Sequence, residues 1–267
     1  MNCVKHSGSF WLGCLLFFGT LLKAQVAQDK LKGDYLRFSL GGQIQTFIDE
    51  FYSPLNYLGL GFNLGVGYVD QSDKWLNDLH LSGGFARLDN EEVLPGTSGI
   101  VSHFDGILEY RLGYAVWHSR AQKLFLGLSS LNQFNFREHS NFSNSAQSVA
   151  GFFNYGFSAE YQWTFALPDF RDNQYPMALT LGWDLPVGSY VLRPGFVRPI
   201  VGDGLGINGI YWWGDFFAWH NDLSLRVFGR NCNQISLTYR FAYVQFKELN
   251  ELYQARHDLL VEFYLVL

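Results

Sequence analysis

Large apolar residues alternate with small or polar residues along much of this 267-residue sequence. The stretch 57–69 reads YLGLGFNLGVGYV, and the stretch 151–164 reads GFFNYGFSAEYQWT. A helix would scatter the apolar members of such a pattern around its axis, whereas a strand points successive side chains to opposite faces. The alternation therefore predicts β-strands that have one apolar and one polar face.

Ten segments follow this pattern: 35–47, 57–69, 77–87, 102–117, 122–136, 149–165, 176–185, 214–228, 233–245 and 256–267. All are longer than the ~5–6 residues of an average strand in a soluble protein. They match the ~9–11 residues that a tilted strand needs to cross a membrane. The segment lengths therefore favour a membrane barrel over the alternative, an aromatic-rich β-domain in water.

The connections between these segments alternate in length. Counted from the N-terminus, the odd connections are mostly longer than the even ones, and outer-membrane barrels combine long outer loops with short periplasmic turns. Both termini are therefore expected on the periplasmic side. The longest connection, 186–213, carries short apolar runs on both sides of Arg193-Pro194-Gly195 that could add a hairpin. About ten strands are expected, with twelve as the alternative.

The composition narrows the choice further. Aromatic residues make up 18% of the chain and charged residues only 16%, against about 25% charged in an average domain. The mean hydropathy of -0.02 is too low for a bundle of membrane-spanning helices. A net charge of -5 argues against a nucleic-acid partner, whose binding surface would be basic.

The N-terminal residues indicate export. A short basic region that contains Lys5 precedes the almost wholly apolar stretch 10–22, and Lys23-Ala24-Gln25 follows. This arrangement is typical of a secretory signal peptide, with cleavage expected after Ala24. The expected organisation is a signal peptide over 1–24, a short periplasmic segment over 25–34 and a transmembrane β-barrel over 35–267.

Cysteine usage depends on this cleavage. Of Cys3, Cys14 and Cys232, only Cys232 would remain in the mature chain. No intramolecular disulfide is then available, so backbone hydrogen bonds and side-chain packing must stabilise the fold.

The chain ends at Leu267 within an alternating segment, which is where bacterial outer-membrane proteins carry their last membrane strand. With the signal peptide, the alternation and the loop asymmetry, the sequence resembles a small bacterial outer-membrane β-barrel protein, although these proteins usually end in Phe. The resemblance covers the mature chain and points to no subfamily. It implies an all-β fold, a closed antiparallel up-and-down barrel in the outer membrane of a Gram-negative-type bacterium. The implied surroundings are outer-membrane lipid and lipopolysaccharide, with a membrane-protein partner as a further option.

The polar face of each segment predicts what lies inside the barrel. The expected inward residues are Arg37, Gln43, Gln45, Asn63, His80, Ser82, His103, Asp105, Glu109, Arg111, Trp117, Glu160, Gln162, Asp184, His220, Asp222, Arg226, Arg240, Asp258 and Glu262. Side chains just fill an eight-stranded barrel, so ten strands predict a plugged or very narrow interior. Because unpaired buried ions are costly, six of these residues are predicted to form an internal ion-pair network: Glu109, Arg111, Glu160, Arg226, Arg240 and Glu262.

Seven tryptophans fall near predicted strand ends or turns: Trp75, Trp117, Trp163, Trp183, Trp212, Trp213 and Trp219. Indole groups prefer the boundary between membrane and water. The positions therefore predict an aromatic girdle.

The sequence contains only weak candidates for a catalytic site. His139-Ser140-Asn141 resembles the His-x-Ser-Asn arrangement of lipid A deacylases, but it lacks the intervening residue. His80 and Ser82 share one strand face, which the predicted register turns toward the interior rather than toward lipid. Both pairs fit polar loop or interior residues better than a catalytic site.

Other motifs are equally weak. The run 204–209, GLGING, formally matches a dinucleotide-binding fingerprint, but no helical pattern follows it. The histidines show no i, i+2 or i+4 pairs, so no metal site is predicted, and no cofactor either. Asp169, Asp172 and Asp203 fall in loops and are expected to be solvated.

The sequence favours two classes of function over the others. The first is a non-enzymatic structural or interaction barrel, such as a subunit of an outer-membrane complex. The second is a narrow pore for small solutes, and lipid acyl hydrolysis comes third.

Overall fold

The computed structural model describes residues 29–50, 53–90, 99–139, 147–168, 174–193, 207–229, 231–248 and 251–267. It contains eleven strands within these ranges: β1 (Gly33–Asp49), β2 (Ser53–Gln71), β3 (Trp75–Asp89), β4 (Val101–His118), β5 (Gln122–His139), β6 (Gln147–Pro168), β7 (Gln174–Arg193), β8 (Ile207–Trp212), β9 (Phe216–Phe228), β10 (Gln234–Phe246) and β11 (Leu252–Val266). The expected signal peptide over 1–24 lies outside the described residues. Among the described residues, no helix is both long enough and apolar enough to cross a membrane.

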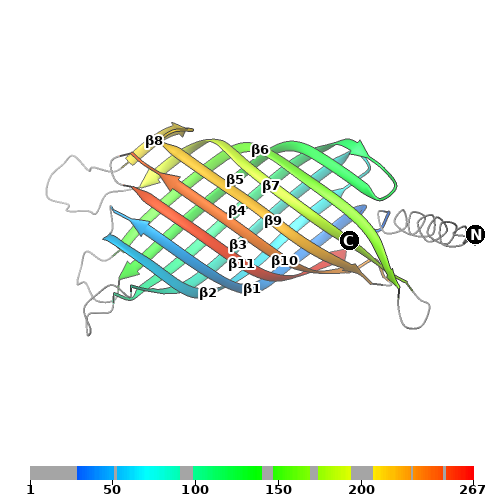
Figure 1. The fold of residues 1–267 in the computed structure, drawn as a ribbon, viewed down its shortest axis with the longest axis horizontal. Helices are drawn as coiled ribbons and strands as arrows, with labels where there is room; N and C mark the ends of the chain where they lie inside the picture. Colours follow the sequence, from blue (N-terminus) through cyan, green and yellow to red (C-terminus); the bar gives the residue numbers. More distant parts are fainter. Residues whose placement is uncertain are drawn as a thin grey trace, which may run out of the picture.

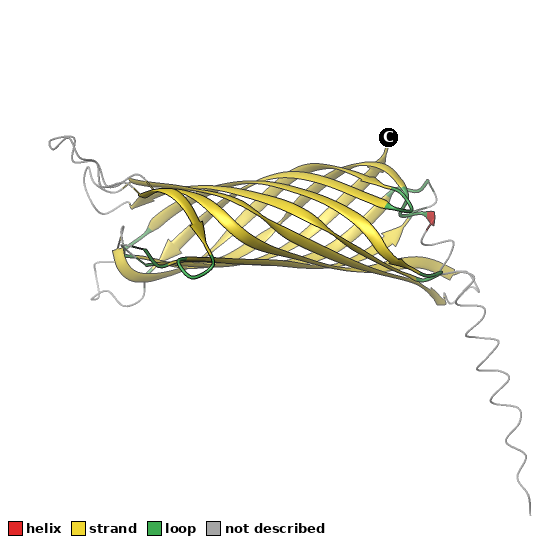
Figure 2. Ribbon diagram, turned by 90° about the horizontal axis from the view of Figure 1, so that it is seen from above, coloured by secondary structure: helices red, strands yellow, loops and turns green. Residues whose placement is uncertain are grey.

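Ten of these strands form a closed ring. Neighbouring strands pair antiparallel in the order β1 to β7, then β9, β10 and β11. The pairing of β1 with β11, from Tyr35 opposite Val266 to Asp49 opposite Leu252, closes the ring. Figure 1 and Figure 2 show from two directions the resulting barrel, whose strands are tilted relative to its long axis. The expected closed up-and-down barrel of about ten strands is confirmed.

β8 is the extra strand, and it results from a change of partner along β7. The first half of β7 pairs with β9, from Met177 opposite Val227 to Asp184 opposite His220. Beyond a register shift in the β6–β7 pairing between Tyr155 and Gly156, β7 pairs with β8 instead. The indole of Trp213 donates a 2.6 Å hydrogen bond to the Pro186 carbonyl at this junction. The expected strand 176–185 is therefore longer than its alternation indicated, because the bulge interrupts the pattern.

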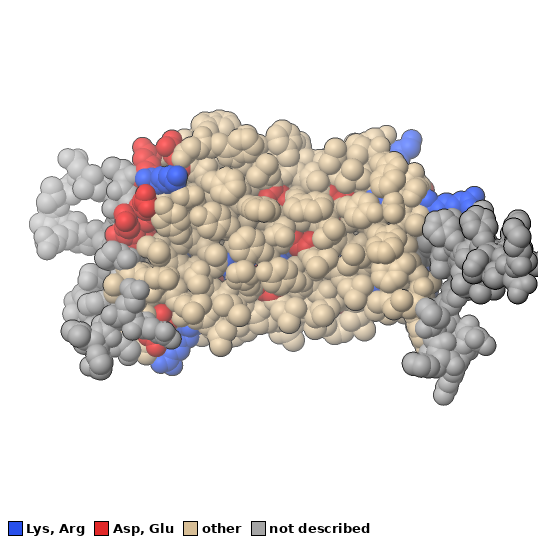
Figure 3. Space-filling view, viewed as in Figure 1, with Lys and Arg blue, Asp and Glu red and all other residues tan. Residues whose placement is uncertain are grey.

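The two faces of the wall differ as the alternation requires. Along β2, Leu58, Leu60, Phe62 and Leu64 are 50–70% exposed, whereas Asn63 is 1% exposed. In Figure 3 the larger charged groups lie at the ends of the barrel, and only small patches of charge are visible between the uncharged side chains of the wall. An antiparallel barrel with an apolar outer band and a polar interior has the architecture of outer-membrane proteins. The fold is that of an outer-membrane-type transmembrane β-barrel.

One residue that was expected inside the barrel lies outside it. Trp117 is 47% exposed on the outer wall. The β4–β5 pairing shifts register between Ala115 and Trp117, so Val116 has no partner across the strands. A single extra residue reverses the facing of the next side chain, which the alternation alone does not reveal.

The other tryptophans lie outside as well. Trp75, Trp163, Trp183, Trp212, Trp213 and Trp219 are between 38% and 54% exposed. Trp183 lies near the middle of β7, away from the strand ends where it was expected. The girdle itself stays a prediction.

Close strand contact at a glycine provides a test of the wall. A Cβ added to Gly127 on β5 would lie 1.9 Å from the Leu112 carbonyl oxygen on β4, whereas a Cβ added to Gly106 would meet nothing within 4 Å. We expect Gly127→Val to prevent closure and Gly106→Val to preserve it. Folding can be measured as the mobility shift between unheated and heated samples on SDS gels. Normal folding of the Gly127 variant would contradict the described β4–β5 contact.

Candidate functional site

The closed wall directs polar side chains from all around the ring into one narrow space. Within the described ranges, eight Lys or Arg and nine Asp or Glu side chains are buried: Arg37, Arg111, Lys123, Arg137, Arg193, Arg226, Arg240 and Arg256, with Asp49, Asp78, Asp105, Glu109, Glu160, Asp184, Asp222, Asp258 and Glu262. The two signs nearly balance. The interior is therefore the candidate functional site, and its electrostatics depend on how these charges pair.

The centre of the interior is organised around Arg111 of β4. Its guanidinium donates to both Asp184 of β7 and Asp222 of β9, with the Nη2 to Asp222 Oδ1 distance at 2.7 Å. His220 Nδ1 lies 3.1 Å from Asp184 Oδ2. β4 is separated from β7 and β9 by β5 and β6 in the ring. The contacts of Arg111 with Asp184 and Asp222 therefore cross the interior.

Glu109, also on β4, connects this centre to two further strands. Its carboxylate lies 3.4 Å from His80 Nδ1 of β3 and 3.5 Å from Arg240 Nη1 of β10. His220 Nε2 lies 3.5 Å from the same carboxylate. The central layer is thus one continuous polar cluster.

A second cluster lies toward the end of the barrel where β1 finishes. The Asp49 carboxylate accepts hydrogen bonds from Arg137 of β5, at 2.9 Å, and from Arg193 of β7. The Arg137 guanidinium lies 4.5 Å from the ring centre of Phe47, and that of Arg193 lies 5.6 Å from the ring centre of Phe246. One carboxylate therefore bridges two opposite parts of the wall.

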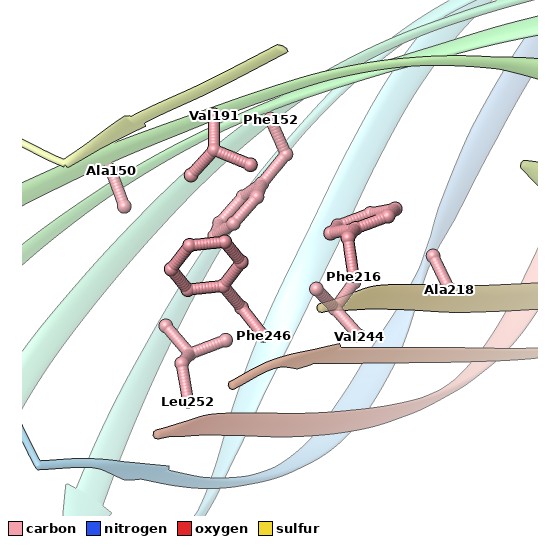
Figure 4. Packing of buried hydrophobic residues seen from close by; sticks show 8 residues of the cluster. All are labelled: Ala150, Phe152, Val191, Phe216, Ala218, Val244, Phe246 and Leu252. Carbon is pink, nitrogen blue, oxygen red and sulfur yellow. The ribbon is translucent and has the colours of Figure 1, made fainter. Parts of the chain in front are cut away.

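Apolar side chains pack beside the Asp49 cluster. Residues of β6, β7, β9, β10 and β11 converge there, as Figure 4 shows: Ala150, Phe152, Val191, Phe216, Ala218, Val244, Phe246 and Leu252. All eight are at most 3% exposed. The interior at this end is filled by rings and aliphatic groups as well as by ion pairs.

A third set of contacts lies toward the end where β1 begins. Arg37 forms a bidentate pair with Asp78, at 2.7 and 3.1 Å. Glu262 accepts hydrogen bonds from Ser236, Thr238 and Tyr264 at 2.7–3.0 Å. Three hydroxyl groups therefore stabilise this carboxylate.

A short N-terminal turn covers this same end. Leu31 is 1% exposed and packs with Ala178 and Phe228. Outside the strands, hydrogen bonds to the Asp29 and Asp73 carboxylates raise the pKa of the Lys32 ammonium. The turn is held by both apolar burial and charge.

The six residues of the predicted network all lie in the interior, but they mostly pair with other residues. Among them, only Glu109 and Arg240 lie within 4.0 Å as an ion pair. Glu160 accepts a 2.7 Å hydrogen bond from Gln162, and Arg226 lies 4.4 Å from the ring centre of Tyr264.

Several residues of the interior ion pairs were not among the inward residues predicted from the sequence. Asp49 and Arg137 continue the alternation of β1 and β5 one step beyond the expected ends, so a longer reading of the pattern would have found them. Arg193 follows the β7 bulge and ends one of the apolar runs that the sequence offered for an additional hairpin, so its strand was open to prediction although its partner Asp49 was not.

Three central side chains have the composition of a metal site. The ligand atoms of Asp184, His220 and Asp222 lie within 4.8 Å of one another. Arg111 donates to both of these carboxylates, so a guanidinium already supplies the positive charge that a cation would bring. The sequence spacing did not single out this group, which in the structure forms an arginine-bridged acid pair.

The interior also contains a serine and a histidine in contact. The Ser39 hydroxyl lies 3.1 Å from His80 Nε2, while Nδ1 of the same ring faces Glu109. A serine activated for catalysis uses the same order of contacts, from the serine hydroxyl to a histidine and from the histidine to a carboxylate. The serine in contact with His80 is Ser39, whereas the sequence pattern had pointed to Ser82. A Cβ added to Gly65 would lie 2.4 Å from Ser39 Oγ, so the wall packs directly against the hydroxyl. All three residues are at most 6% exposed, so little of this group is accessible to a substrate.

The other motifs are less informative. Ser140, Asn141, Asp169, Asp172, Asp203 and residues 204–206 lie outside the described residues. His139 is the last residue of β5, and the structure describes its backbone only.

Comparison with known proteins adds no closer identification. No family model matches the chain, and no curated protein matches it. Among solved structures, it is similar to the β domain of the Bordetella autotransporter BrkA, with 11% identity, coverage of 88% of this chain and 100% of that chain, and a TM-score of 0.37.

Two further matches are similarly distant. The translocator domain of the autotransporter NalP from Neisseria meningitidis is 11% identical over 90% of this chain and 93% of that chain, with a TM-score of 0.34. An outer-membrane channel from Pseudomonas putida F1 is 10% identical over 88% of this chain and 96% of that chain, with a TM-score of 0.33. These similarities are too low to transfer any property of those proteins to this chain.

The Arg111 cluster can be tested by removing its charges. Arg111→Met leaves two buried carboxylates facing each other, and we expect a loss of about 3–5 kcal/mol in the free energy of unfolding. The variant Arg111→Met/Asp184→Asn/Asp222→Asn removes the repulsion and should recover much of this loss. Urea unfolding of the refolded barrel in detergent or lipid measures both values.

A matched control uses an arginine on the outer wall. Arg87 is exposed at the end of β3, so Arg87→Met should change the stability by no more than about 0.5 kcal/mol. An equally small effect at Arg111 would show that its pairing does not stabilise the barrel.

Proposed function

We propose that the chain is a non-enzymatic structural or interaction barrel of a bacterial outer membrane, which acts through its walls and loops rather than through an open channel. The observation that carries this proposal is the set of ion pairs that cross the interior. Arg111 joins β4 to β7 and β9, and Asp49 joins β1 to β5 and β7. A solute that passed through would have to separate these buried charges, and this would cost several kcal/mol for each ion.

The surroundings of the barrel support the same proposal. The outer wall is mostly apolar along the strands, which suits the acyl chains of outer-membrane lipid. Charged residues gather at the ends, where lipid headgroups and lipopolysaccharide would lie. Stabilising the envelope or serving as a subunit of a membrane complex needs no cavity and no cofactor.

A narrow pore is the second candidate, and one observation favours it. The side-chain amides of Gln43, Asn63 and Asn154 are buried and make no hydrogen bond to the described residues. Buried polar groups of this kind are commonly satisfied by internal water. A file of such water molecules would give small solutes or protons a path.

Conductance separates the two candidates. Purified protein in planar lipid bilayers should give no stable single-channel steps, because the interior charges are paired across the lumen. An open porin in the same membranes serves as the positive control. Reproducible steps that disappear when the protein is denatured would overturn the closed barrel in favour of the pore.

The interaction role needs its own measurement. Affinity purification from detergent-solubilised outer membranes should recover either a stoichiometric membrane-protein partner or a defined self-assembly. Recovery of the monomer alone would leave envelope stabilisation as the remaining form of the proposal.

A further inference from the structure

The pairing of the barrel wall is interrupted between β7 and β9. These strands pair as far as Asp184 opposite His220, and β7 resumes pairing only at Gly188, now with β8. Residues 185–187 of β7 and 216–219 of β9 have no partner across this stretch in the described part of the chain, although 216–219 still pair with β10 on their other side. We call this unpaired stretch the β7–β9 window.

The end of the window that lies toward β8 is closed by a short turn. The chain crosses from β8 to β9 at Gly214, whose φ of 121° is a conformation that glycine adopts most readily. The Asp215 carbonyl accepts a 2.8 Å hydrogen bond from the Lys247 amide, which holds the start of β9 against β10. Pro186 has no amide hydrogen, and its carbonyl accepts a hydrogen bond from the Trp213 indole. A side chain therefore links the two borders where a backbone ladder would otherwise do so.

The outer side of the window is apolar. Leu185, Phe217 and Trp219, which point outward along its borders, are 38%, 37% and 45% exposed. Trp213 is 54% exposed, so its ring lies on the outer surface beside the window. Charged groups enter hydrocarbon only at a high cost in free energy. A molecule that reaches the window from this side must therefore be uncharged and dissolved in the membrane.

The inner side offers hydrogen-bonding groups. Ser189 of β7 lies opposite Asn154 of β6, two residues beyond the border of the window, and the two are 0% and 1% exposed. The Ser189 hydroxyl and both polar atoms of the Asn154 amide make no hydrogen bond to the described residues. Ala218, the inward residue of the opposite border, carries only a methyl group. Buried polar groups in native proteins are nearly always satisfied, so these atoms point to a bound partner.

We propose that the window binds a small uncharged amphiphile from the membrane, with its polar group toward Ser189 and Asn154 and its apolar body between Leu185 and Trp219. A hydroxyl or amide group supplies a donor and an acceptor, which a plain alkyl chain lacks. Entry requires the Trp213 indole to turn aside, and this breaks one hydrogen bond. The inference goes beyond the proposed function, because the interior stays closed along its axis and is reached from the side.

Photo-crosslinking in proteoliposomes tests the proposal. The probe is a fatty alcohol with a diazirine beside its hydroxyl group, and the control probe is the alkane with the diazirine at the same end. In the parent protein, the alcohol should label Ser189 or Ala218, which are at most 1% exposed, and excess unlabelled alcohol should prevent this. The alkane should label outward residues only. Mass spectrometry of the digested protein locates the adducts.

Two variants separate recognition from access. Ser189→Ala/Asn154→Leu removes the inner polar groups and should weaken competition by the unlabelled alcohol about tenfold, the scale of one or two lost hydrogen bonds. Trp213→Ala removes the cover and should increase the labelling of interior residues. Its matched control is Trp75→Ala, a tryptophan that is 51% exposed at the other end of the barrel, and it should leave the labelling unchanged. The gel mobility of unheated samples verifies the folding of each variant.

Three results would overturn the proposal. Labelling confined to outward residues, equal at Trp219 and at Leu259 on the continuously paired β11, would show ordinary contact with lipid. Interior labelling by the alkane as strong as that by the alcohol would assign the window to an acyl chain. Absence of interior labelling in both the parent and Trp213→Ala would show a sealed wall, whose buried polar atoms are satisfied by water.

The window and the closed interior fail separately. Conductance in planar bilayers would refute the closed interior and leave the labelling at the window as the test of the amphiphile site. A silent barrel without interior labelling would refute the window and leave the closed interior standing.

Discussion

The hydrogen bonds that join β1 to β11 are the constraint on which the rest of this structure depends. Within hydrocarbon, backbone N–H and C=O groups find no water, so an open sheet edge is excluded and the ring must close. Closure brings the first and last strands of the chain together from Tyr35 opposite Val266 onward. It also fixes an inside and an outside, so the alternation of each strand becomes a separation of polar from apolar side chains.

The narrow interior follows from closing only ten strands. Long charged side chains from opposite walls then reach one another, and their burial requires that they pair. Arg111 joins two carboxylates at the centre, and Asp49 joins two guanidinium groups toward one end. Aromatic and aliphatic side chains fill the remaining space, as around Phe246. On the proposal that these interactions also close the interior, the outer wall and the loops are the surfaces left for function.

Much of the fold could be predicted, because the face of the sheet to which a side chain points depends only on the alternation of residues along its own strand. The alternation identified the ten strands of the ring and placed nearly every expected inward residue inside. The errors occurred where the backbone departs from strict alternation. One extra residue at Val116 turned Trp117 outward, and the β7 bulge hid the strand that continues to Arg193. Bulges depend on how neighbouring strands twist and pair, and this information is not present in either strand alone.

The sequence by itself determined which side chains face inward, because period-two alternation requires no knowledge of the neighbouring strands. Only the tertiary structure decided which of them meet. Arg193 and Asp49 are 144 residues apart, and Arg111 and Asp222 are 111 apart, yet each pair is in direct contact. Such contacts depend on the number of strands, their tilt and the stagger at closure, which are properties of the whole ring. The predicted network therefore named residues of the right location, and the ring geometry selected different partners for most of them.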